Sequence, residues 1–307
     1  MANVTPAMIK ELREMTNAGM MDCKKALAES DGDMEGAVEW LRKKGLSSAA
    51  KKAGRTAAEG VIAVKISDDM RKGSISEVNC ETDFVAQNDN FLQFAQEVVH
   101  TVHTEGVSDV EALRGGSISG MGYEERIGLA VSKVGEKVDV RRFVSIEMGE
   151  GGVVNGYVHA NGKIGVIVGA QCDSAKTAEA VRDILRDIAM HTAAMKPLYL
   201  TEDEIPEADI EKEREIAIEQ LKKEGKPEAM FDKIIPGKLK KYAKDITLVN
   251  QPFVKDDKKS VAQVLSETAK AAGGSAELKG FVRYEVGEGL EKKTANFADE
   301  VAAQMKG

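Results

Sequence analysis

The fold is decided by the stretch Asn79-Cys80-Glu81-Thr82-Asp83-Phe84-Val85-Ala86-Gln87-Asn88-Asp89. It follows a run typical of a strand, residues 74–78, and precedes a helix-like pattern that begins near Asn90. Its polar residues can hydrogen-bond their own backbone, which suits the connection from a strand to a helix. At its centre, Asp83 and Phe84 place a carboxylate beside a large aromatic ring, where a connection should be exposed. Such a ring is either a plug for the protein's own core or a group that enters another protein, and the area that aromatics bury by itself favours the plug.

Five blocks along the chain favour the second interpretation. Residues 79–86 resemble the signature of the bacterial elongation factor Ts family, the guanine-nucleotide exchange factors of elongation factor Tu. The blocks come in that family's order and span nearly the whole chain, and we therefore expect the family's function here. The other blocks similar to the family are residues 10–27, 162–166 (Gly-Lys-Ile-Gly-Val), 250–254 (Asn-Gln-Pro-Phe-Val) and 280–289.

The resemblance implies a role for each residue at the centre of the stretch. Phe84 is expected to act as a wedge beside the Mg²⁺ site of the partner, and Asp83 to help displace structure near that metal. Thr82 and Val85 would flank and hold the loop. A turn-capping Thr82 and a buried Val85 are equally good interpretations of the residues alone, and both are compatible with the wedge.

The resemblance also implies contacts away from the wedge. Arg13, Met20 and Met21 stand where the family's N-terminal domain touches the GTPase domain of elongation factor Tu, and exposed methionines adapt well to a partner. Packing of the methionines in the core and a solvated position for Arg13 remain open. The region from His159 to Gly165 resembles the part that meets the distal β domain of the partner.

Composition agrees with several small domains. The 307 residues (33.1 kDa) are enough for two or more cores, with 42% hydrophobic and 31% charged residues. The net charge of −8 argues against a nucleic-acid partner, because such binders normally carry a basic patch. Three scattered cysteines are typical of reduced thiols, and no stretch approaches the apolar length of a membrane span or a signal peptide. We expect a cytoplasmic protein with no membrane or nucleic-acid contact.

Hydrophobic periodicity predicts an α+β fold. Helical spacing dominates the N-terminus, where Gly45 is expected to end a third helix and residues 47–55 to form a linker. Strand-like runs predict two hairpins, residues 60–79 and 154–171, each followed by a helix, so the core is expected to consist of two related α+β subdomains with antiparallel sheets. A glycine-rich stretch, residues 114–122, is expected to be a flexible loop.

The predicted domains follow from these patterns and from the resemblance. Residues 1–54 resemble a three-helix ubiquitin-associated domain. A core N-subdomain (55–148) and a core C-subdomain (149–286) follow, the second with an inserted helical hairpin at about 202–245. The last segment, 287–307, is a C-terminal helical module with an amphipathic helix from Leu290 to Met305.

The sequence lacks the motifs of an active site. The four histidines form no HExxH pair, and the spacing from Gly156 to Lys163 is one residue too long for a P-loop, with Ile164 where a hydroxyl must bind Mg²⁺. We expect no cofactor, no metal, no catalytic residue and no enzymatic activity. The alternatives are an adaptor that uses the ubiquitin-associated-like domain and an enzyme with an unrecognised site. Self-association through the helical hairpin is left open.

Overall fold

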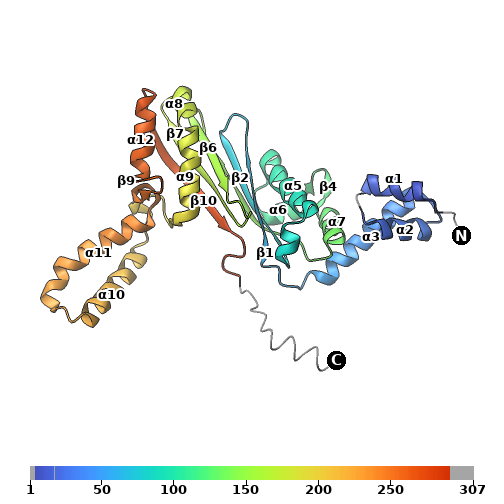
Figure 1. The fold of residues 1–307 in the computed structure, drawn as a ribbon, viewed down its shortest axis with the longest axis horizontal. Helices are drawn as coiled ribbons and strands as arrows, with labels where there is room; N and C mark the ends of the chain where they lie inside the picture. Colours follow the sequence, from blue (N-terminus) through green and yellow to red (C-terminus); the bar gives the residue numbers. More distant parts are fainter. Residues whose placement is uncertain (1–3, 17, 291–307) are drawn as a thin grey trace.

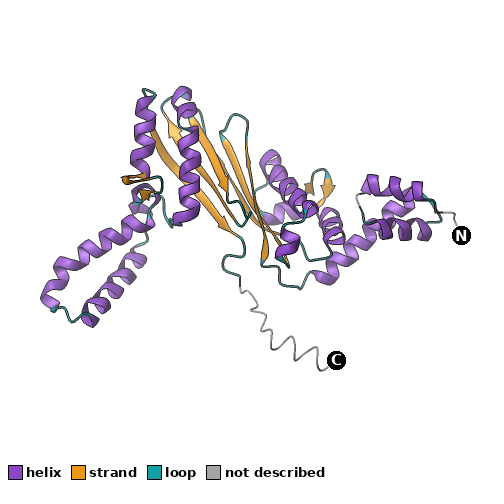
Figure 2. Cartoon of the chain, in the orientation of Figure 1, coloured by secondary structure: helices purple, strands orange, loops and turns teal. Residues whose placement is uncertain are grey.

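The computed structural model describes residues 4–16 and 18–290. Within these residues, two three-stranded antiparallel sheets pack face to face at the centre of the molecule, and helices cover the outer face of each sheet (Figures 1 and 2). A bundle of N-terminal helices projects at one end and a helical hairpin at the other, which makes the molecule elongated (Figure 1). The predicted α+β class is confirmed.

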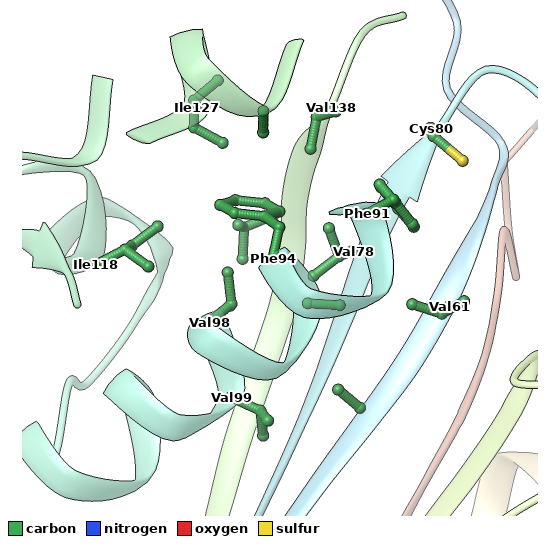
Figure 3. Close-up of a cluster of buried hydrophobic side chains, with 14 of the residues drawn as sticks. Val61, Val78, Cys80, Phe91, Phe94, Val98, Val99, Ile118, Ile127 and Val138 are labelled. Carbon is green, nitrogen blue, oxygen red and sulfur yellow. The ribbon is translucent and has the colours of Figure 1, made fainter. Parts of the chain in front are cut away.

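The first sheet has the strand order β1-β2-β5, with β1 at Glu59–Ile66, β2 at Lys72–Cys80 and β5 at Asp139–Glu147. Helix α5 (Asp89–Glu105) lies across its outer face because its apolar residues recur on one side. Together with α7 (Tyr123–Val134) it closes a core (Figure 3). The largest fully buried side chains of this core are Phe91, Phe94, Leu113 and Ile118.

The second sheet repeats this topology. Its order is β6-β7-β10, in which β6 (Gly152–Val158) and β7 (Ile164–Cys172) form a hairpin, and β10 (Ala276–Glu285) pairs with the second hairpin strand, as β5 does in the first sheet. Helices on the outer face close its core. They are α8 (Ala175–Ala180), α9 (Arg182–Met195) and α12 (Val261–Ala271).

A layer of aliphatic side chains joins the two sheets. Ile62 and Ile75 from the first sheet meet Val154 and Ile167 from the second, and all four are buried. The backbones approach closely at Gly165, where an added Cβ atom would lie 2.4 Å from Cγ2 of Ile62. Burial of this layer holds the two halves of the core as one body.

The N-terminal helices depart from the prediction at one point. The helices are α1 (Pro6–Thr16), α2 (Met20–Glu29) and α3 (Met34–Lys52). Gly45 does not end α3, and the predicted linker from residue 47 is helical as far as Lys52. Gly45 instead lies against Gly128 of α7, where a Cβ atom would be 2.9 Å from the carbonyl oxygen of Gly128. The glycine therefore serves a close helix–helix contact rather than a helix end.

The glycine-rich stretch is also more ordered than predicted. Residues 114–122 form the end of α6 (Val110–Arg114) and a small hairpin of β3 (Ser117–Ile118) and β4 (Met121–Gly122). The side chain of Ile118 is fully buried in the first core, and the amide of Ser119 donates to Oγ1 of Thr101. These contacts attach the hairpin to α5, so the expectation of a flexible loop was wrong.

The projecting hairpin consists of α10 (Glu207–Lys223) and α11 (Phe231–Ile246), which pack through a small core around Leu221, Phe231 and Ile235. The turn η2 (Glu228–Met230) connects the two helices. Short elements on either side of the hairpin join it to the rest of the second half, namely η1 (Glu202–Glu204), η3 (Leu248–Asn250), β8 (Pro252–Phe253) and β9 (Asp256–Ser260). The predicted C-terminal helix lies outside the described residues beyond Leu290.

Candidate functional site

The stretch after β2 forms a short, capped helical turn. Thr82 is the N-cap of α4 (Asp83–Ala86), and its Oγ1 accepts a hydrogen bond of 3.3 Å from the amide of Val85. Ala86 is buried and Val85 is half-buried against the first core, which anchors the turn. The capping role predicted for Thr82 is therefore present.

Phe84 points away from this anchor. Its side chain is 83% exposed, the most exposed of the large apolar residues in the described part of the chain. The interpretation of Phe84 as a plug of its own core is thus wrong. Asp83 beside it is also exposed. The sequence places an apolar ring in water, on a turn with fixed ends.

The cysteine that precedes this turn is structural. Burial, with the nearby carboxylates of Glu136 and Glu59, raises the pKa of the Cys80 thiol to about 12. The thiol therefore stays protonated at neutral pH, and its Sγ donates to the carbonyl oxygen of Thr82 at 3.1 Å. A protonated thiol is a poor nucleophile and a poor metal ligand.

A groove of about 490 Å³ separates α4 from the turn between β6 and β7. Asp83 and Leu92 line one side, and Asn161 and Lys163 line the other. The ammonium group of Lys163 forms an ion pair of 2.6 Å with Glu59, and this hydrogen bond raises the pKa of Lys163. The structure thus brings two predicted regions, residues 82–85 and 159–165, to one face.

The members of the second region differ in exposure. His159 is exposed, and its Nδ1 lies 3.1 Å from the hydroxyl of Tyr157. Gly165 is buried against Ile62, so close packing of the sheets already accounts for a glycine there. Contact of either residue with a partner stays a prediction.

Sequence reasoning missed an apolar surface beside His159. A hollow of about 450 Å³ is lined by Ile164 of β7, Met190 of α9 and Val254, among others. Leu198 and Met195 are also exposed on this part of the chain. These residues come from separate elements, so no local sequence pattern predicts that they lie together. The one available hint is the excess of apolar residues at the end of α9.

The N-terminal site residues are all exposed. Met20 and Met21, at the start of α2, are 59% and 72% exposed, which excludes their packing in the core. Arg13 and Met20 line a hollow of about 280 Å³ that also includes Asn90, at the start of α5, and Lys133, near the end of α7. Arg13 and Met20 therefore adjoin the core near the start of α5.

The candidate catalytic motifs of the sequence can be placed on the described residues. Among them, no group of three or more His, Cys, Asp or Glu side chains could hold a metal ion. His191 is buried and is hydrogen-bonded to Gln251. The segment from Gly156 to Lys163, whose spacing does not match a P-loop, belongs to the β6–β7 hairpin. Within the same residues, no helix combines the length and apolar character that crossing a membrane requires.

Comparison with known proteins agrees with the family resemblance of the sequence. The family model described as Elongation factor TS matches residues 81–288. The chain is 57% identical over 306 residues to Elongation factor Ts of Nautilia profundicola, covering 99% of this chain and 100% of that protein. It is 56% identical over 303 residues to Elongation factor Ts of Nitratiruptor sp., with 99% of each chain covered. To Elongation factor Ts of Thioalkalivibrio sulfidiphilus it is 48% identical over 304 residues, again with 99% of each covered.

The fold and these similarities define a translation elongation factor. Both the match over residues 81–288 and the full-length similarities include the α4 turn. The chain belongs to the elongation factor Ts family.

Proposed function

We propose that this protein binds elongation factor Tu, in its GDP-bound and nucleotide-free forms, and speeds the release of GDP so that GTP can replace it. A GTPase holds GDP through phosphate contacts and a Mg²⁺ ion that bridges phosphate oxygens. A partner that binds the distorted, nucleotide-free form more tightly than the GDP form must weaken GDP binding by the same factor. The protein needs no reaction chemistry of its own for this.

The exposure of Phe84 is the observation that carries the proposal. An apolar ring in water gains free energy when it enters another protein, roughly 25 cal/mol for each Å² that it buries. The capped turn holds the ring at a fixed place, so little conformational entropy is lost when it inserts. Residues Thr82 to Val85 would enter near the Mg²⁺ site, with Asp83 competing for groups around the metal.

The remaining contacts would hold the protein on its partner. Arg13, Met20 and Met21 provide an exposed surface on one side of the α4 turn. The β6–β7 turn around His159 and the apolar hollow beside it provide another. Neither surface includes Phe84, and both would bind the GDP-bound and the nucleotide-free partner alike, which raises affinity rather than the maximal rate.

The domain division, the cellular location and self-association stay predictions in this proposal. Residues 1–54 would form the N-terminal anchor, 55–148 and 149–286 the two core subdomains, and 287–307 a further contact. Action in translation places the protein in the cytoplasm. The α10–α11 hairpin exposes Ile216 and Met230, which could serve self-association.

Release of labelled GDP from purified elongation factor Tu tests the function. Stopped-flow fluorescence with excess unlabelled nucleotide should show a rate that rises with the concentration of this protein and then saturates. Added GDP should weaken the binding of this protein to elongation factor Tu. A rate that stays at the spontaneous value over the whole concentration range would contradict the proposal.

A further inference from the structure

One carboxylate attaches the exposed turn to the rest of the first core. Glu136 lies in the connection between α7 and β5, and its Oε2 accepts hydrogen bonds from the amides of Glu81 (3.1 Å) and Thr82 (2.9 Å). Its Oε1 accepts a third, of 2.7 Å, from the hydroxyl of Thr82. Bonds to an ionised acceptor are about twice as strong as those between neutral groups. This side chain therefore binds both the backbone and the cap of the turn that carries Phe84.

The attachment is reciprocal. The carboxylate of Glu81 accepts a hydrogen bond of 2.7 Å from the amide of Lys137, the neighbour of Glu136. The guanidinium of Arg55 also lies 3.2 Å from Glu81, and the ammonium group of Lys137 donates to the carbonyl oxygen of Arg55. Two connections, residues 81–82 and 136–137, thus bind each other through crossed side-chain-to-backbone bonds.

These bonds fix the orientation of the Thr82 hydroxyl. Because its hydrogen goes to Glu136, its lone pairs are free to accept from the amide of Val85, which is the cap of α4. The carbonyl oxygen of Thr82 accepts from the thiol of Cys80. The amide, hydroxyl and carbonyl of Thr82 are all engaged, two residues before Phe84.

The other end of the attachment is equally defined. Helix α7 ends at Val134, and the left-handed conformation of the next residue, Gly135 (φ 78°), lets its amide donate to the carbonyl oxygen of Val131. Glu136 follows directly, so its position is set by a helix that packs in the first core. Within the described ranges, the side-chain hydrogen bonds of Glu136 all go to Glu81 and Thr82.

We propose that Glu136 is a positioning residue for nucleotide exchange, which holds the turn rigid so that Phe84 keeps its place against the resistance of the partner. This inference rests on the proposed function. A wedge on a turn free to rotate would yield before the partner did, so the loss of Glu136 should lower the maximal rate of GDP release more than the affinity.

The test compares E136A, E136Q and the wild-type protein, with E105A as control. Glu105 is exposed at the end of α5, away from the turn. The carboxamide oxygen of E136Q can still accept from the two amides, whereas E136A removes every acceptor. Two quantities are measured for each variant: the dependence of GDP release on protein concentration, and the hydrogen exchange of the amides of residues 81 and 82 without partner.

We expect E136A to exchange these amides faster and to lower the maximal rate ~10- to 100-fold, the scale that a misplacement of about 1 Å can have on a positioned group. The half-saturating concentration should change less than the maximal rate. E136Q should lie between E136A and the wild type, and E105A should equal the wild type.

A wild-type maximal rate in E136A, despite faster amide exchange, would overturn the role of Glu136 while leaving the proposed function intact. So would an effect confined to the half-saturating concentration. If circular dichroism shows that E136A is unfolded, the decision rests on E136Q. Faster amide exchange in E136Q together with an unchanged maximal rate of GDP release would overturn the role of Glu136. Absence of any acceleration by the wild type would instead overturn the proposed function itself.

Discussion

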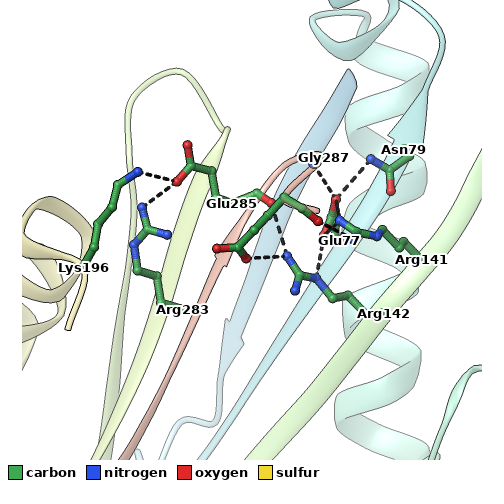
Figure 4. Close-up of polar contacts among 9 residues, drawn as sticks. Glu77, Asn79, Arg141, Arg142, Lys196, Arg283, Glu285 and Gly287 are labelled. Carbon is green, nitrogen blue, oxygen red and sulfur yellow. Dashed lines mark hydrogen bonds and ion pairs between the residues drawn. The ribbon is translucent and has the colours of Figure 1, made fainter. Parts of the chain in front are cut away.

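The carboxylate of Glu77 in β2 accepts a hydrogen bond of 2.8 Å from the amide of Gly287, which follows β10 (Figure 4). Glu77 is completely buried, and the guanidinium groups of Arg141 and Arg142 in β5 also bind it, at 3.0 and 2.6 Å. Arg142 further stacks on the ring of Tyr284, with 4.1 Å between its guanidinium carbon and the ring centroid. One buried anion thus joins the first sheet to the chain that leaves the second.

Removal of this anion should destabilise the fold. E77A leaves two guanidinium groups without their buried acceptor, a change that costs about 3–5 kcal/mol for a fully buried pair. Because Arg141 and Arg142 are partly exposed, we expect the lower end of this range. Urea unfolding measures the free energy. E147A serves as control, since Glu147 is exposed and its contact with Lys72 is 3.7 Å long; a loss as large in E147A as in E77A would contradict the account.

The same carboxylate should make stability depend on pH. Burial raises the pKa of Glu77, but the Gly287 amide, Arg141 and Arg142 outweigh it and hold the pKa below its ordinary value of 4.5. Its contribution is therefore fully present above pH 4.5, where the unfolded chain is also ionised, and is lost as the pH falls through the lower pKa of the folded state.

The measurement is the free energy of unfolding of the wild type and of E77Q, followed from neutral to acidic pH. Since the glutamine does not titrate, the difference between the two proteins should be constant at neutral pH and shrink below pH 4.5. A difference in unfolding free energy that stays constant into the acid range would show that these contacts do not lower the pKa of Glu77.

Crowding between α3 and α7 should make a normally favourable substitution harmful. Alanine in a helix gains about 1 kcal/mol over glycine. In G45A, however, the new methyl group would lie 2.9 Å from a backbone oxygen of Gly128, and overpacking of this kind costs about 1–3 kcal/mol. Thermal unfolding should show a net loss of stability. G237A in α11 is the matched control, because this glycine also lies inside a helix and nothing lies within 4 Å of its added methyl group. A stabilised G45A would mean that α3 and α7 can move apart to make room for the methyl group.

Local sequence patterns predicted those elements of the fold that depend only on neighbouring residues. The β6–β7 hairpin was predicted from Asn161-Gly162, whose glycine has the required positive φ of 69°. Strand β5 was not predicted, because a bulge opposite Glu77 and Val78 leaves Arg141 unpaired in the register. Val140 and Phe143 are then both buried although they stand three residues apart, which hides the alternation of a strand.

The site could be predicted only where a local motif carries it. The exposed Phe84 lies in a continuous stretch, and the resemblance located it. Glu136 lies 54 residues from Thr82 and has no motif of its own, so only the folded structure reveals the contact. The end of α3 was predicted wrongly for a related reason. Gly45 by itself favours a helix end, but its close contact with Gly128 overrides that preference.

The methionines at the start of α2 should contribute to docking rather than to the exchange step. Replacement of both Met20 and Met21 by alanine should raise the half-saturating concentration for GDP release and leave the maximal rate unchanged, because such contacts are alike in the ground and distorted states. Exposed positions of this kind change stability by no more than about 0.5 kcal/mol. M230A, at the tip of the α10–α11 hairpin, is the control; a fall in the maximal rate of the double variant would refute a pure docking role.

The most direct test concerns Phe84 itself. F84A removes a ring that is 83% exposed, so the free energy of unfolding should change by no more than about 0.5 kcal/mol. Stopped-flow release of labelled GDP from elongation factor Tu, at saturating concentrations of folded F84A and of the wild type, then isolates the wedge. We expect F84A to bind elongation factor Tu yet lose most of the acceleration. Release as fast as with the wild type would contradict the central claim that this ring opens the nucleotide site.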